Sequence, residues 1–156
     1  MLSLIAAVTL ILVFGIAYWR HIAGRRRMTR FATGIRERHA LKALFVSKLD
    51  RSFIALCLDD QHLVLGREAN ETVYPLSDVI AVEEARQVDK GRIRRLEIVV
   101  RLKGEAAPEH RYLIQRWTGF LGPLEDAGHI QPMLEHAARV RSLLLSAAGL
   151  AVAEPA

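Results

Sequence analysis

The apolar stretch that follows Met1 constrains this chain most, because residues 2–19 (LSLIAAVTLILVFGIAYW) contain no charged side chain. As a helix this stretch would be about 27 Å long, close to the roughly 30 Å of a bilayer core. It lacks the basic start and the small-residue cleavage site of a secretory signal. A chain of 156 residues is also too short to cover such a helix on all sides in a soluble core. We therefore expect a retained transmembrane helix at residues 2–19.

Aromatic and basic side chains come directly after this stretch. Tyr18 and Trp19 stand where aromatic side chains meet lipid headgroups, and arginines follow them within a short window. An excess of positive side chains marks the cytoplasmic side of a membrane helix. We expect a bacterial inner-membrane protein with its N-terminus outside and its C-terminal domain in the cytoplasm. The residues assigned to the membrane interface are Tyr18, Trp19, Arg20, Arg25, Arg26, Arg27 and Arg30.

The positive charge of the chain is concentrated in one segment. The formal net charge is +5, but residues 20–51 alone hold ten Lys and Arg against two acidic residues. The rest of the chain holds twelve basic and fifteen acidic residues. Segment 20–51 could therefore attract anionic lipid headgroups or nucleic acid. Nucleic acid is disfavoured, because only Phe31 and Phe45 offer bases an aromatic side chain to stack on.

The composition divides the chain into four parts. After the helix at 2–19 we expect a basic juxtamembrane linker at 20–35, a cytoplasmic domain at 36–149 and a disordered tail at 150–156. The start of the domain, residues 36–49 (RERHALKALFVSKL), allows three interpretations. It is an amphipathic helix lying on the membrane, the same helix packed on the domain, or a first strand.

Short apolar runs separated by turn residues fill most of the expected domain. Runs at 52–58 and 62–66 flank Asp59-Asp60-Gln61 and predict a β-hairpin. Further strands are expected at 80–88, 92–103 and 110–117, with Gly91 in the turn between the first two. The connections are too short for crossovers, so the strands should be antiparallel.

The C-terminal region predicts a helix. Residues 130–149 (IQPMLEHAARVRSLLLSAAG) place Ala137, Val140 and Leu144 on one face, and Gly149 ends the pattern. The opposite face carries Glu135, Arg139, Ser142 and Ser146. One apolar helix face can cover the open end of a small sheet.

This order of elements resembles the pleckstrin-homology-like fold found in many bacterial proteins, often behind a membrane anchor. The stretches FIALCLDDQHLVLGR, VYPLSDVIAVE and RRLEIVVRL carry the resemblance, which covers about residues 43–148. It implies an α+β fold, with a mostly antiparallel β-roll or partly open barrel capped by the C-terminal amphipathic helix. Lipid-binding members use a basic hairpin loop, but this hairpin carries Asp59 and Asp60. No binding residue is therefore transferred from the family.

The sequence shows no motif for catalysis, a metal or a cofactor. His129 and His136 would lie about 10.5 Å apart along a helix, too far to share one ion. A glycine-framed nucleophile and a phosphate-binding loop are both missing from the sequence. Arg92, Arg94 and Arg95 form a small cluster that is either a solvated strand edge or a docking site.

These observations favour a non-catalytic binding or assembly module with a single membrane anchor. Its expected partners are the anionic lipid bilayer and another membrane or cytoplasmic protein, or a second copy of the chain. The alternative is an anionic-lipid or nucleic-acid binder that acts through segment 20–51. The sequence does not specify the ligand or the oligomeric state.

Overall fold

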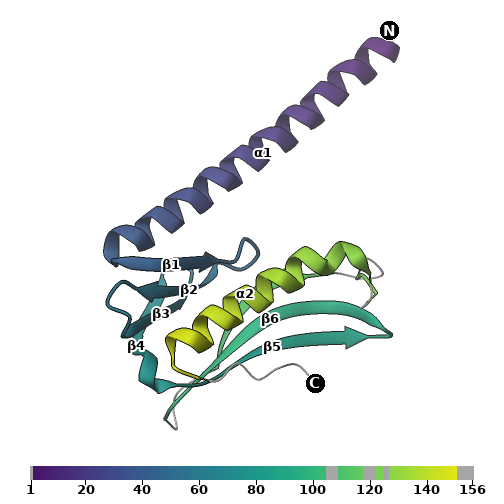
Figure 1. Cartoon of the computed structure of the whole chain (residues 1–156). Helices are drawn as coiled ribbons and strands as arrows, with labels where there is room; N and C mark the ends of the chain where they lie inside the picture. Colours follow the sequence, from purple (N-terminus) through teal and green to yellow (C-terminus); the bar gives the residue numbers. More distant parts are fainter. Residues whose placement is uncertain (1, 105–108, 118–121, 125–126, 151–156) are drawn as a thin grey trace. The chain divides into compact units, whose positions relative to one another are not determined.

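The structure of the chain is a computed structural model that describes residues 2–104, 109–117, 122–124 and 127–150. In the first helix, side chains are described for residues 12–16, 18–19 and 22 onward. The chain divides into two units, Met1–His39 and Ala40–Ala156. The first unit is a helix, and the second holds all the described strands (Figure 1).

Helix α1 (Leu2–Arg38) is one continuous element of 37 residues. It includes residues 20–35, for which a juxtamembrane linker was expected, and shows that this segment is helical. The segment contains five Arg, one Met and two Ala, all of which favour a helix. Gly24 and Gly34 each cost only about 1 kcal/mol relative to alanine, and their neighbours outweigh this cost.

The expected transmembrane helix is not supported by the structure. Among the residues that the structure describes, no helix is both long enough and apolar enough to cross a membrane. The predicted transmembrane helix is therefore wrong, and so is the single-pass inner-membrane location based on it.

The first sheet has four antiparallel strands in sequential order, as Figure 1 shows. They are β1 (Leu41–Val46), β2 (Ser52–Cys57), β3 (His62–Arg67) and β4 (Asn70–Pro75). Segment 36–49, for which three interpretations were open, thus contains a strand. The predicted hairpin is confirmed as β2 and β3, which pair from Ser52 to Leu56. In its turn, an Asp59 carboxylate oxygen accepts hydrogen bonds from the backbone N–H groups of Gln61 and His62 at 3.0 and 3.1 Å.

The second sheet has three antiparallel strands. They are β5 (Val79–Asp89), β6 (Arg92–Leu102) and β7 (His110–Arg116). Gly91 adopts a φ of 71° in the turn between β5 and β6, as its position predicted. One face of β6 is buried through four residues at alternate positions: Leu96, Ile98, Val100 and Leu102.

The β-roll or partly open barrel that was expected is replaced by these two separate sheets. Pro75, which has no backbone N–H, ends β4, and the 3-10 turn η1 (Leu76–Asp78) follows at once. The backbone N–H of Leu76 donates to the carbonyl of Gln61 at 2.8 Å, which holds this turn against the first sheet. The ladder is therefore interrupted between β4 and β5, and β5 begins a new sheet.

Helix α2 (Gln131–Ala147) lies across the space between the two sheets (Figure 1). A short 3-10 turn, η3 (Gly128–Ile130), leads into it. Its buried residues join a single core with residues of both sheets. The helix residues in this core are Ala137, Val140, Leu144 and Leu145. Leu150 also packs on the core, and the rest of the expected tail, 151–156, lies outside the described residues.

Candidate functional site

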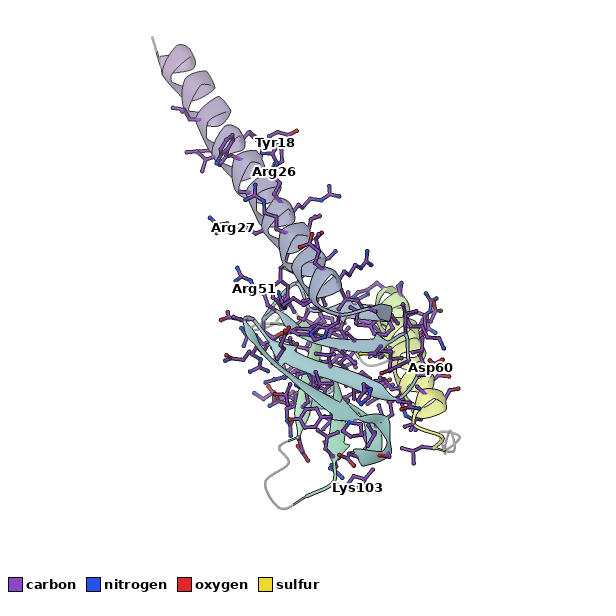
Figure 2. The ribbon with its side chains drawn as sticks, turned by 90° about the vertical axis from the view of Figure 1, so that its left-hand side faces the viewer. Tyr18, Arg26, Arg27, Arg51, Asp60 and Lys103 are labelled. Atoms are coloured by element: carbon purple, nitrogen blue, oxygen red, sulfur yellow. The ribbon has the colours of Figure 1, made fainter. Side chains whose placement is uncertain are left out.

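An open groove of about 670 Å³ lies between the first sheet and the second half of α2. We call it the β1–α2 groove. From the strands and the β2–β3 turn it is lined by Lys42, Ala43, Leu56 and Asp60. From the helix it is lined by Arg139, Ser142, Leu143, Ser146 and Ala147. Figure 2 shows Asp60 beside α2. This volume is in the range of ligand-binding pockets in proteins.

The groove combines an apolar floor with a charged rim. Ala43 and Leu56 face each other across β1 and β2, and Leu143 and Ala147 stand opposite on the helix. On the rim, Lys42 Nζ lies 2.7 Å from Asp60 Oδ1, and both side chains are more than half exposed. Arg139 is exposed and makes no ion pair with any residue that the structure describes. The lining therefore carries one uncompensated positive charge.

The helix side of the groove is a polar stripe. The stripe begins at Arg139 and continues with Ser142, three positions later, and Ser146, seven positions later. This spacing places the three residues on one face of α2, beside the buried residues. The sequence pattern assigned these residues to an ordinary solvent-facing surface. It could not show that β1, about a hundred positions earlier in the chain, lies beside them.

A second hollow, of about 590 Å³, lies on the other side of α2 against β5. Three of its four charged groups, all except the exposed Glu135, are engaged within the chain. Arg86 Nε pairs with Glu84 Oε1 at 2.5 Å, and Arg141 Nε donates to the carbonyl of Val82 at 3.3 Å. The β1–α2 groove differs because its lining has two basic residues and one acidic residue, whereas the second hollow has two of each, so the groove is the stronger candidate for binding a charged partner.

A serine, an aspartate and a histidine meet where the two sheets join. Asp50 Oδ1 accepts hydrogen bonds from the backbone N–H and the hydroxyl of Ser52, at 3.0 and 2.7 Å. Asp50 Oδ2 lies 3.2 Å from Arg67 Nη2. Burial raises the pKa of Asp50, but the hydrogen bonds from Ser52 and Ser47 and the charge of Arg67 lower it overall.

The histidine of this corner is not placed to activate the serine. Burial lowers the pKa of His110 to about 4, and Arg67 acts in the same direction. The Nε2 atom of His110 is buried and has no hydrogen-bond partner among the described residues. The Ser52 hydroxyl donates to Asp50 instead, and Ser52 is fully buried. A nucleophile must reach both a base and a substrate, so this corner has a structural role.

The two histidines of the C-terminal region do not form a metal site. His136 contacts aromatic rings, with its centroid 6.1 Å from that of Phe45, and its Nε2 lies 3.3 Å from the Tyr112 hydroxyl. Burial raises the pKa of Tyr112 to about 12. Within the described ranges, no group of three or more His, Cys, Asp or Glu residues could hold a metal ion.

The residues assigned to a membrane interface all lie along α1. Tyr18 and Trp19 are exposed, as are Arg25, Arg26 and Arg27, and Figure 2 shows Tyr18, Arg26 and Arg27 projecting from the helix. Arg30 is exposed in the next turn, and the side chain of Arg20 lies outside the described part. Their assignment depended on a transmembrane helix, which the structure does not support.

The three arginines proposed as a docking cluster each form a hydrogen bond or an ion pair with another residue of the chain. Arg92 Nη1 donates to the Gly122 carbonyl at 2.8 Å, and Arg94 Nη2 pairs with Asp89 at 3.0 Å. Arg95 pairs with Glu97 at 2.5 Å. Each of the three arginines therefore already has a partner among the described residues.

Comparison of the chain with protein-family models, with curated proteins and with solved structures finds no match. The candidate site therefore depends on the geometry of this chain alone.

Proposed function

We propose that the Ala40–Ala156 unit is a non-catalytic binding or assembly module of the pleckstrin-homology-like kind, and that it holds its partner in the β1–α2 groove. The order of elements supports the resemblance, because two small antiparallel sheets are followed by one amphipathic helix packed on both. In this arrangement the helix and the sheets form a scaffold, and ligands bind at the surface between them.

One observation favours the β1–α2 groove over the other candidate sites. The β1–α2 groove joins an apolar floor to polar groups that are exposed, namely Lys42, Asp60, Arg139 and two serines. Binding sites combine apolar surface with a few polar groups that fix orientation. The polar groups of the corner at Ser52 are instead directed at one another.

Photo-crosslinking of the full chain in cells tests this function. A photoreactive amino acid replaces Ser146, in the groove, or Ser77, an exposed serine on η1 that does not line it. We expect an adduct of defined mass from position 146 and none from position 77. Equal adducts from both positions, or none from position 146, would contradict the groove as the binding site. Turnover of lipids or nucleotides by the purified protein would contradict the non-catalytic part of the proposal.

A second candidate function is binding of an anionic partner, lipid headgroup or nucleic acid, through the basic segment 20–51. The exposure of Arg25, Arg26, Arg27 and Arg30 along one continuous helix favours it, because their charges are close together. Replacing these four arginines with glutamine should abolish salt-sensitive binding of the full chain to anionic vesicles or to RNA, whichever is bound. Unchanged binding would exclude the segment.

A further inference from the structure

We propose that the partner held in the β1–α2 groove is an extended acidic peptide, which pairs with the free edge of β1 and directs a carboxylate to Arg139. This inference rests on the proposed function and specifies the chemistry of the ligand. Three features support it: the unpaired edge of β1, the polar stripe of α2, which is as long as about three residues of extended chain, and an uncompensated positive charge.

The first feature is the strand edge. β1 is the outer strand of its sheet and pairs with β2 only, so its other edge pairs with no described strand. Consecutive strand residues normally point to opposite faces, yet Lys42 and Ala43 both line the groove. The pairing of β1 with β2 shifts register between Leu41 and Ala43, which explains this. The groove therefore includes two side chains of β1, whose outer edge could exchange backbone hydrogen bonds with a strand-like peptide.

The second feature is the polar stripe of α2 that lines the same groove. From Arg139 to Ser146 the helix rises about 10.5 Å, which equals about three residues of extended chain. The hydroxyls of Ser142 and Ser146 can donate to or accept from a peptide backbone. Leu143, between them, completes the apolar floor with Ala43 and Leu56. A short peptide with small or β-branched side chains at alternate positions fits this surface.

The third feature is the charge. The Lys42 ammonium has Asp60 as a counterion at 2.7 Å, whereas Arg139 has none among the residues described. A guanidinium group binds a carboxylate through two parallel hydrogen bonds. A lysine at the same place in the peptide would face Arg139 with a like charge. The groove should therefore prefer a peptide that carries Asp or Glu near the Arg139 end.

Peptide libraries test this ligand chemistry with the full chain. Each library has peptides of about seven residues with Val, Thr, Ser and Ala around one fixed Glu or Lys, and fluorescence anisotropy reports binding. We expect the Glu library to bind about tenfold tighter than the Lys library. In Arg139→Glu this order should reverse. In Arg116→Glu, an exposed arginine on β7 outside the groove, the order should stay the same.

A second measurement tests the pairing with β1. Glu peptides with methylated backbone nitrogens cannot donate to a strand edge, so they should bind about tenfold more weakly than unmethylated ones. Equal binding of methylated peptides would overturn the strand pairing. Equal binding of the Glu and Lys libraries, an unchanged order in Arg139→Glu, or no saturable binding of any library would overturn the acidic ligand. An adduct from position 146 would then still support the binding module, so the two proposals can fail separately.

Discussion

The hydroxyl oxygen of Ser52, on β2, accepts a hydrogen bond from the backbone N–H of Leu113, on β7, at 3.1 Å. Ser52 is fully buried, and its own proton is directed to Asp50. Because β2 belongs to the first sheet and β7 to the second, this one side chain links the two sheets. The open end between the sheets is covered by α2, which forms one wall of the groove.

Ser52→Ala should lower the free energy of unfolding by about 1–3 kcal/mol, because it leaves the Leu113 N–H without its acceptor in a buried position. Urea denaturation measures the loss. The matched control is Ser142→Ala, an exposed serine of α2, which should change the free energy by less than about 0.5 kcal/mol. Equal effects of the two substitutions would show that Ser52 does not link the sheets.

His110 should make the stability fall as the solution is acidified. Its pKa is about 4 in the folded chain and near 6.5 in the unfolded chain, so the unfolded chain takes up the proton first. The free energy of unfolding should therefore fall between pH 6.5 and 4, by about 3 kcal/mol in total. The contribution of Asp50, whose pKa is lowered below the ordinary value of an aspartate carboxyl, is lost only at lower pH.

The variant His110→Gln should remove this part of the pH dependence. The control His129→Gln replaces an exposed histidine of η3 and should keep it. Denaturation curves at pH 7, 5.5 and 4 are sufficient to distinguish the two variants. If His110→Gln shows the same fall as the unsubstituted chain, the loss must come from other groups.

Gly66→Ala should destabilise the first sheet. A Cβ at position 66 would lie 2.5 Å from the carbonyl oxygen of Asn70 and also against the buried ring of Phe53. Neither group can move without disturbing β4 or the core, so we expect a loss of about 1–3 kcal/mol. Gly128→Ala is the control, because a Cβ there meets nothing within 4 Å. Thermal denaturation of both variants checks this, and an unchanged melting temperature for Gly66→Ala would be inconsistent with the close approach.

Substitutions of the two arginines that pair with Glu97 should have non-additive effects on the free energy of unfolding. The side chain of Glu97 is 4 % exposed and pairs with Arg95 and with Arg111, each at 2.5 Å. Replacing either arginine with Met should cost about 1 kcal/mol, since the other still pairs with the carboxylate. Replacing both should cost about 3–5 kcal/mol, because a buried charge is left without a partner.

Adding Glu97→Leu to the double variant should recover most of this loss, since the unpaired charge is then absent. Urea denaturation of all four variants completes the comparison. If the double variant loses no more than the sum of the two single ones, the carboxylate is not held by the two arginines together.

Local patterns in the sequence predicted most of the Ala40–Ala156 unit. The β2–β3 hairpin follows from two apolar runs around Asp59 and Asp60, and the alternation at Leu96, Ile98 and Val100 identified the buried face of β6. These patterns are local, because the residues that form each of them lie within a few positions of one another in the chain. The division into two sheets was missed, because it depends on how the turn after Pro75 is held against Gln61.

The transmembrane prediction for α1 failed, and the helical form of residues 20–35 was not foreseen. Gly24 and Gly34 suggested a linker, although Arg, Met and Ala around them favour a helix. The transmembrane prediction relied on the apolar composition of residues 2–19 and on the aromatic and basic side chains at its end. The groove was missed because Lys42 and Arg139 come from distant parts of the chain. Only the stripe of Arg139, Ser142 and Ser146 could have indicated it, and a helix surface facing solvent has the same pattern.

Competition between the peptide libraries and the crosslinked partner tests the central claim most directly. The full chain with a photoreactive residue at position 146 is irradiated in cell extract with increasing amounts of the Glu or the Lys library. If the partner occupies the β1–α2 groove as an acidic strand, the Glu library should reduce the adduct to background while the Lys library leaves it intact. An adduct that persists at saturating Glu library, or that both libraries suppress equally, would contradict the account.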